Sequence, residues 1–356
     1  MMNRGDIVEL KIEDYAFEGK GIARVAQENE EKKFIVFVNG SYPGDVVKAQ
    51  IFKKKKSYAE AKTIEVVTPS EFRTKAQCSY FGVCGGCKQQ DLIYSKQLEY
   101  KSKQVKDILE RLGGLSEFKM EAITPSDKTI FYRNKMEFSF AEKRWLTTEE
   151  INESSEILDR DFSLGLHIPR VFDKALDINE CFLQSEESNQ ILNFTRKFFK
   201  ERKISIYSTK THEGYLRNLV IKQSHHTNDL MVNLVTSNED ESLMMEYTSD
   251  LLKQIPAITT VINNINLKKS QVALGDYEKV FHGSGYIFDL IGKYKFRISA
   301  NSFFQTNTLQ AAKLYQTVLD FAEFNGSEIV YDLYSGAGTI SIYMSEYVKK
   351  VYAFES

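Results

Sequence analysis

The sequence has no long apolar segment and no strong bias of charge. No run of apolar residues is long enough to cross a membrane and no secretory signal opens the chain, so we expect a cytoplasmic protein without membrane contact. The formal net charge is only −2 over 356 residues, which excludes a uniformly basic nucleic-acid binder. Any nucleic-acid partner must therefore be bound through local basic patches. At this length, two or three domains are expected.

Cysteine is also scarce, and all four cysteines fit one pattern. Cys78, Cys84 and Cys87 follow a C-x5-C-x2-C spacing, and Cys181 lies far downstream. In a reducing compartment such a group indicates a metal centre more often than disulfides. Four cysteines, three of them on a glycine-containing loop, predict a [4Fe-4S] cluster. The alternatives are a four-cysteine zinc site, which usually pairs two short knuckles, and buried structural cysteines or two disulfides.

The first seventy residues predict a small all-β domain. Five short segments are rich in β-branched and aromatic residues and are separated by glycine or charged turns, which is compatible with an OB-like barrel spanning 1–70. The segments are 8–12, 21–25, 34–38, 46–52 and 61–67. A lysine run lies between the last two, beside Phe52 and Tyr58, and we predict that it binds RNA; the alternative is a solvated turn. The run consists of Lys53, Lys54, Lys55 and Lys56.

The middle of the chain, 71–292, predicts an antiparallel α+β domain that carries the cysteine loop. Helical spacing covers 92–112, 184–202 and 241–254. Alternating segments that predict strands lie at 131–140, 162–168, 215–223, 230–236 and 259–267. Arg133 and Arg217 lie in two of these segments and are candidate RNA contacts. The alternative for each is an exposed strand residue with an ordinary ion pair.

The last part, 293–356, predicts the beginning of a Rossmann-like α/β unit. A helix over 308–324 is followed by a strand, a turn with Gly336 and Gly338, a second helix and a second strand that ends at Glu355. Glycines in such a turn let a ligand approach the backbone, and an acid after the second strand can accept hydrogen bonds from ribose hydroxyls. Ile340 or Ser341 replaces the third glycine of a dinucleotide motif, so the pattern favours S-adenosylmethionine. The alternative is a structural unit without a ligand.

Together, the barrel, the cysteine spacing and the segments SFFQTN and DLYSGAGTI resemble the RNA uracil-5-methyltransferase family. The similarity is to its iron–sulfur branch, which has an N-terminal TRAM domain and acts on 23S rRNA; tRNA is the alternative substrate. The resemblance implies that the four cysteines bind the [4Fe-4S] cluster and that the helix at 92–112 packs on the methyltransferase domain. It also implies that S-adenosylmethionine is contacted by Gln305, Tyr334, Gly336, Thr339 and Glu355. We expect a monomer with mixed α/β, α+β and all-β parts.

The sequence departs from this family at its C-terminal end. Family members continue into a loop, a nucleophilic cysteine and a base that act on the uracil, whereas this chain stops soon after Glu355. We therefore expect an N-terminal fragment that has no catalytic residue of its own and is inactive alone. Two alternatives are a redox or radical iron–sulfur enzyme and a non-catalytic RNA-binding iron–sulfur fragment.

Overall fold

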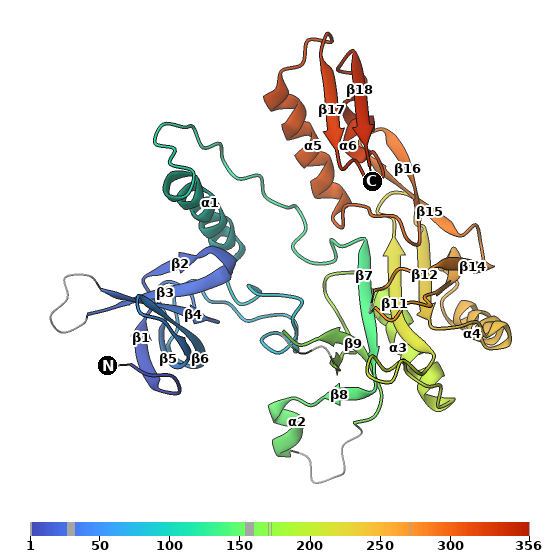
Figure 1. The fold of residues 1–356 in the computed structure, drawn as a ribbon, viewed down its shortest axis with the longest axis horizontal. Helices are drawn as coiled ribbons and strands as arrows, with labels where there is room; N and C mark the ends of the chain where they lie inside the picture. The colour runs from blue at the N-terminus through green and yellow to red at the C-terminus, as the bar shows by residue number, and fades with distance from the viewer. Residues whose placement is uncertain are drawn as a thin grey trace. The chain divides into compact units, whose positions relative to one another are not determined.

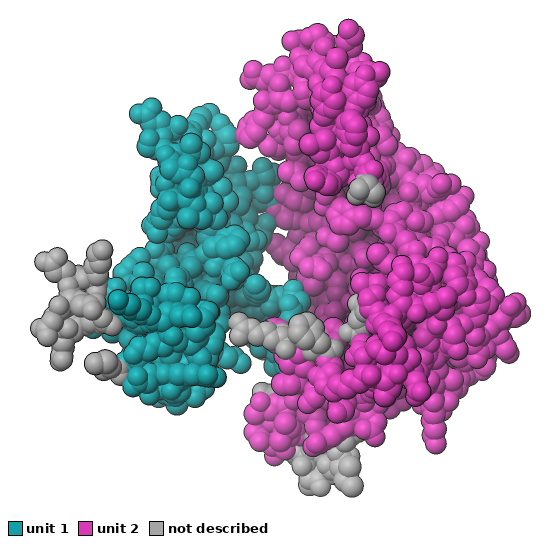
Figure 2. Space-filling model, in the orientation of Figure 1, with its two compact units in different colours: residues 1–125 teal, residues 126–356 magenta. Residues whose placement is uncertain are grey.

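The chain forms two compact units, residues 1–125 and 126–356 (Figure 2). The computed structural model describes residues 2–26, 33–153, 160–169, 171, 173–270 and 272–355. Each unit has its own sheet and its own core. The segment between the last helix of the first unit and the first strand of the second, 112–134, has no regular element.

The first unit is built on a six-stranded sheet with the order β1-β5-β6-β4-β3-β2. Only the β4–β6 pair is parallel. Alternate residues of the strands face one core, in which Val36, Val38 and Val47 are fully buried. The elements are β1 Ile7–Lys11, β2 Asp14–Ala16, the 3-10 turn η1 Phe17–Gly19, β3 Lys20–Val25, β4 Phe34–Asn39, β5 Val46–Lys54 and β6 Tyr58–Thr68. The five predicted strands are confirmed, and β2 is additional.

Helix α1, Tyr94–Arg111, packs against this sheet. The Tyr100 ring lies 5.2 Å from the Tyr15 ring of β2, and the Gln104 amide donates to the Ala16 carbonyl at 3.0 Å. The packing of this helix on the methyltransferase domain, which the resemblance implies, stays a prediction; within its own unit the helix contacts β2 and the segment before it. The domain boundary predicted after residue 70 lies inside this compact unit, which also contains the cysteine loop and α1, and it stays a prediction.

The second unit begins with an eight-stranded sheet of order β14-β13-β12-β11-β7-β9-β10-β8. Most neighbours in this sheet are antiparallel, as expected, but β12 pairs in parallel with β13 and β8 with β10. A parallel neighbour needs a crossover, and helix α4 supplies it between β12 and β13. The elements are β7 Lys135–Ala141, β8 Lys143–Trp145, α2 Thr148–Glu153, β9 Ser163–His167, β10 Lys174–Asp177, α3 Glu186–Glu201, β11 Leu216–Gln223, β12 Leu230–Thr236, α4 Glu241–Gln254, β13 Thr260–Ile265 and β14 Tyr277–His282.

The two faces of this sheet are covered by different elements (Figure 1). Helices α3 and α4 cover one face, where the Phe199 ring of α3 packs edge-on against Phe140 of β7 at 6.2 Å. The opposite face is covered by a hairpin of β15, Tyr286–Ile291, and β16, Tyr294–Ser299, whose inner residues share a core with Met231 of β12. The domain boundary expected near 293 falls in the turn of this hairpin, between two hydrogen-bonded strands.

The last elements form a strand–helix–strand unit beside a longer helix (Figure 1). They are α5 Thr308–Ala322, β17 Ile329–Leu333, α6 Thr339–Met344 and β18 Lys350–Phe354. Strands β17 and β18 are parallel neighbours, so the predicted opening of a Rossmann-like unit is confirmed. Among the described residues, no helix has both the length and the apolar character needed to cross a membrane.

Candidate functional site

The carboxyl ends of β17 and β18 bring together the predicted turn and its acid. The Gly336 N–H donates to a carboxylate oxygen of Glu355 at 2.7 Å. Gly336 and Gly338 have φ of +55° and +67°, a region in which glycine carries no steric penalty, and Tyr334 before them has φ of +62°. A Cβ built on Gly336 meets no atom within 4 Å. The turn is therefore open to the approach of a ligand, with a carboxylate beside it.

Two further bonds fix this turn to the helices next to it. The Thr339 hydroxyl, at the start of α6, lies 2.7 Å from the hydroxyl of Tyr315 in α5. Asp332, near the end of β17, accepts from the Ser341 hydroxyl. Thr339 is thus engaged in a side-chain bond, whereas Tyr334 is 86% exposed and projects from the turn.

Gln305 lies in the segment that leads into α5, and Asn134 holds this segment in place. The Asn134 amide donates to the Gln305 carbonyl at 2.7 Å and to the Thr308 hydroxyl at 2.8 Å. Thr308 in turn donates to the buried Asp289 carboxylate of β15 at 2.8 Å. The structure therefore orders the backbone at Gln305 through Asn134, which immediately precedes β7, and Asp289 of β15. The role of Asn134 and Asp289 in holding this segment was not predicted, and no motif marks it.

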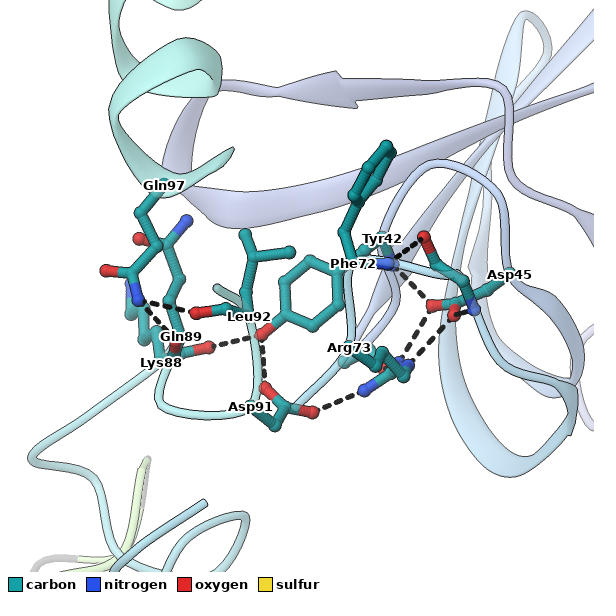
Figure 3. A network of polar contacts seen from close by, with 11 residues as sticks. Tyr42, Asp45, Phe72, Arg73, Lys88, Gln89, Asp91, Leu92 and Gln97 are labelled. Carbon is teal, nitrogen blue, oxygen red and sulfur yellow. Dashed lines mark hydrogen bonds and ion pairs between the residues drawn. The ribbon is translucent and has the colours of Figure 1, made fainter. Parts of the chain in front are cut away.

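The cysteine loop is anchored to the six-stranded sheet at both of its ends (Figure 3). Arg73, before the loop, pairs with Asp45 at 2.8 Å and also with Asp91, which follows the loop. Burial alone would lower the pKa of Arg73, but the two carboxylates reverse this effect and raise it. The Tyr42 hydroxyl donates to the Asp91 carboxylate, and its oxygen lies 3.2 Å from the Lys88 carbonyl oxygen. The same ion pairs therefore fix the start and the end of the loop.

Three sulfurs are gathered on this loop with N–H donors beside them. The Gly86 N–H donates to the Cys84 sulfur, and the Gln90 amide donates to the Cys87 sulfur, both at 3.3 Å. Burial raises the pKa of the Cys84 thiol; the Gly86 N–H opposes this rise, and the neighbouring Cys87 and Cys78 add to it. Such donors suit sulfurs that carry charge. None of the four cysteines, all of which lie within the described residues, forms a disulfide in the structure.

Cys181 belongs to the other compact unit, where it is buried before α3 and donates its N–H to Asn189 at 2.8 Å. Its predicted position upstream of that helix is confirmed. Across the parts of the chain that are described, no group of three or more Cys, His, Asp or Glu side chains is arranged to hold a metal ion. The cluster therefore stays a prediction, which the donor chemistry of the loop fits.

The predicted basic patches have different surroundings. Lys54, Lys55 and Lys56 are exposed at the turn between β5 and β6. Lys53 forms an ion pair with Glu60, and its ammonium lies 5.8 Å from the centre of the Tyr58 ring. The run therefore offers three exposed cations beside a ring, which is compatible with the predicted RNA contact.

The prediction of an RNA contact at Arg217 is corrected by the structure. Its guanidinium is buried, donates to the carbonyls of Asn266, Lys268 and Ser270, and stacks on the Tyr207 ring at 4.0 Å. It holds the loop after β13 and is not available to a phosphate. Arg133 lies just before β7 and is half-buried, with its backbone N–H bonded to the Leu183 carbonyl at 2.8 Å. Its RNA contact stays a prediction.

Comparison with known proteins agrees with this architecture. Residues 2–64 match the TRAM domain. The chain is 41% identical to an uncharacterized RNA methyltransferase of Chlorobaculum tepidum, over 99% of this chain and 72% of the relative. It is 39% identical to an uncharacterized RNA methyltransferase of Bacteroides thetaiotaomicron, over 96% of this chain and 74% of that protein.

A solved structure shows the same fold over most of the chain. It is the tRNA (uracil-54, C5)-methyltransferase of Pyrococcus abyssi in complex with S-adenosyl-L-homocysteine. The two chains are 27% identical, with a TM-score of 0.69 over 95% of this chain and 70% of the archaeal one. The N-terminal TRAM unit and the methyltransferase-like end of the chain therefore occur together in a protein that was solved with a product of the methyl donor bound.

Proposed function

Because the chain belongs to a family of RNA methyltransferases, we propose that it serves the methylation of uridine at C5 in RNA, with S-adenosylmethionine as methyl donor. We expect the protein to act in the cytoplasm as a monomer. One observation carries the assignment of the donor site: the Gly336 N–H and the Glu355 carboxylate meet at the carboxyl ends of two parallel strands. This is where a Rossmann-like sheet binds the ribose of a nucleoside.

Each predicted residue has a role at this site. Glu355 would accept hydrogen bonds from the ribose hydroxyls, and the open turn at Gly336 would let the nucleoside approach the backbone. Thr339 would keep α6 in place through Tyr315. Gln305 and Tyr334 would contact the rest of the donor, since Gln305 is positioned by Asn134 and Tyr334 is exposed at the turn. The bound donor supplies a methyl group on a sulfonium, which makes the methyl carbon electrophilic.

The substrate proposed from the resemblance is 23S rRNA. A second candidate is tRNA, and the observation that favours it is the fold shared with an archaeal enzyme that acts on uracil-54 of tRNA. The exposed cations Lys54, Lys55 and Lys56 and the half-buried Arg133 would contact RNA phosphates in either case.

The expected chemistry is covalent catalysis, because C5 of uracil is a weak nucleophile. A cysteine thiolate adds to C6, which leaves the electron pair of the double bond at C5 in an enolate. C5 takes the methyl group from the sulfonium, a base removes the C5 proton, and the thiolate departs as the double bond re-forms. If all four cysteines bind a cluster, none is free for this step. We therefore assign no catalytic residue within 1–356.

The [4Fe-4S] cluster is the second cofactor proposed. Cys78, Cys84, Cys87 and Cys181 would bind it, and its role is structural or RNA-orienting because methyl transfer moves no electron between substrates. We expect anaerobically purified protein to contain about four irons per chain, as such a cluster requires. Cys181→Ser should lose the iron as fully as Cys84→Ser. One zinc and no sulfide in the wild type would contradict the cluster.

The methyl-transfer proposal is tested with RNA that carries tritium at C5 of uridine. Protein expressed from its complete reading frame is incubated with S-adenosylmethionine and either 23S rRNA fragments or tRNA transcripts. Substitution at C5 releases tritium to water, and we expect release from the rRNA; release from tRNA alone would favour the second candidate. No release from either RNA would contradict the function.

A matched pair of variants tests the donor site in the same assay. Glu355→Gln should raise the KM for S-adenosylmethionine about tenfold, as loss of a charge-assisted hydrogen bond predicts. Glu201→Gln, which removes an exposed carboxylate from α3, should leave it unchanged. Equal KM values for both variants would remove Glu355 from the site.

A further inference from the structure

The outer face of the β15–β16 hairpin carries aromatic rings and cations in alternation. Strand residues alternate between two faces, and the inner residues of this hairpin, such as Ile287 and Ile298, are buried in the core. The outer face consists of Tyr286, Phe288 and Leu290 on β15, opposite Ser299, Arg297 and Lys295 on β16. It contains no acidic residue.

The cations on this face lie over the rings. The Lys295 ammonium is 4.1 Å from the centre of the Phe288 ring, and the Arg297 guanidinium is 5.3 Å from the centre of the Tyr286 ring. The two rings contact each other edge-on at 5.4 Å. Lys295 and Arg297 are both exposed, and no ion pair with a carboxylate is recorded for either within the described residues. Their positive charges are therefore available to an anionic partner.

The neighbouring groups do not cancel this charge. Lys293, in the hairpin turn, pairs with Glu346 of the strand–helix–strand unit. Asp229 lies at the edge of β15, where its carboxylate accepts from the Phe288 N–H and the Thr227 hydroxyl, both at 2.8–2.9 Å. It is thus engaged in holding the hairpin to the loop between β11 and β12.

We propose that the outer face of the β15–β16 hairpin, formed by Tyr286, Phe288, Lys295 and Arg297, binds single-stranded RNA of the substrate. Phosphates would draw the flexible Lys295 and Arg297 side chains off the rings, and the uncovered rings would each stack with a base. A sheet surface that combines rings for bases with cations for phosphates is a recurrent means of binding RNA. This inference rests on the proposed function, because it takes RNA as the substrate.

The position of the hairpin suits this role. Its inner side is continuous with the core that holds Phe304 and α5, immediately next to Gln305. RNA bound on the outer face is thus held by the element that also supports the proposed donor site. The RNA contact predicted from the sequence was the lysine run of the first unit. The hairpin adds a contact in the second unit, and its strands contain no comparable run of basic residues.

The test measures binding of a fluorescein-labelled oligouridylate as a function of salt. Lys295→Gln combined with Arg297→Gln should weaken binding and reduce the slope of log K against log salt by about 1.4, since each phosphate contact of single strands contributes about 0.7. Lys197→Gln combined with Lys253→Gln removes the same charge from α3 and α4 and should change neither quantity.

A ring variant separates stacking from charge. Phe288→Leu should weaken binding about tenfold, as the loss of one stacked base predicts, while the salt slope stays that of the wild type. Unchanged affinity in both hairpin variants, with normal RNA binding by the wild type, would overturn the inference and leave the proposed function intact. Failure of the wild type to bind RNA would instead count against the proposed function. Competition by polyglutamate as effective as that by RNA would assign the face to an acidic protein.

Discussion

Lys222 of β11 is a buried lysine whose surroundings change its protonation. Its ammonium donates to the carbonyls of Ser299 and Ser302, each at 2.8 Å, and so joins the sheet to the end of the hairpin. Burial, together with the neighbouring Lys135, lowers the pKa of Lys222 to about 7, against the opposing charges of Glu278 and Glu137. The folded protein therefore releases a proton from this side chain several pH units earlier than the unfolded chain does.

We predict that this proton makes the stability of the second unit depend on pH. Between about pH 7 and the ordinary lysine pKa of 10.5, the unfolded state binds more protons, so the free energy of unfolding rises with pH. The slope should approach about 1.4 kcal/mol per pH unit inside this window and vanish below it. Urea unfolding at pH 7 and pH 9, followed by the fluorescence of Trp145 in β8 of the same sheet, measures it.

Two variants isolate the contribution of this side chain. Lys222→Met should remove the pH-dependent part, although it leaves two carbonyls without a donor and so costs stability at both pH values. Lys253→Met, on the exposed surface of α4, should unfold with the pH dependence of the wild type. A Lys222→Met protein with the wild-type slope would show that another group is responsible.

Lys222 and Arg217 also show what could not be predicted from single residues. Both lie on β11, where apolar alternation indicates a strand with one exposed face, and basic residues on such a face are natural candidates for RNA contacts. The structure buries both faces of this strand, one under α3 and α4 and the other under the hairpin and the loop after β13. The partners of these side chains are backbone carbonyls about fifty to eighty residues downstream, as the bonds of Arg217 to Asn266 and of Lys222 to Ser302 show. No local pattern indicates such partners.

At the scale of elements, Asn134 links β7 to the beginning of α5. We predict that Asn134→Ala destabilises the second unit by about 1 to 3 kcal/mol, because the Thr308 hydroxyl and the Gln305 carbonyl lose a buried partner. It should also weaken S-adenosylmethionine binding, since the backbone at Gln305 is no longer fixed. Isothermal titration and urea unfolding give the two quantities.

A control of similar destabilisation separates the two effects. Thr195→Val breaks the 2.7 Å bond between the hydroxyls of Thr195 in α3 and Tyr247 in α4, on the opposite face of the sheet. Its cofactor affinity should stay that of the wild type. If both variants weaken the cofactor equally, the Asn134 effect reflects overall stability and not the position of Gln305.

Elements with a clear pattern of apolar residues were predicted well. Elements that form only by pairing with distant strands were not. The β12 strand and the α4 helix follow the predicted ranges residue for residue, because β12 is a short run rich in apolar residues and α4 keeps its helical apolar spacing. The short β8 and β10 are defined by tertiary pairing, because β8 pairs with β10 and β10 also pairs with β9. The β15–β16 hairpin had a usable signal, since Gly292 and Lys293 separate two alternating runs and Gly292 has φ of +59°. The domain boundary predicted at 293 fell between these two runs, so they were not recognised as one hairpin.

At the scale of the whole chain, the family was predictable and its finer assignments stay predictions. Membership among RNA methyltransferases is confirmed, because the motifs that indicated it extend along the whole chain and so do the aligned relatives. The iron–sulfur cluster and the preference for 23S rRNA stay predictions. Each depends on a bound group or a partner that local spacing does not specify.

The segment 112–134 has a consequence for how such proteins diversify. No helix or strand crosses it, since α1 ends at Arg111 and β7 begins at Lys135, and each side has its own hydrophobic core. Recombination within it would join the N-terminal half of one homologue to the C-terminal half of another without cutting a hydrogen-bonded ladder. Chimaeras spliced there are a natural means to exchange substrate preference between family members while each half keeps its own interior.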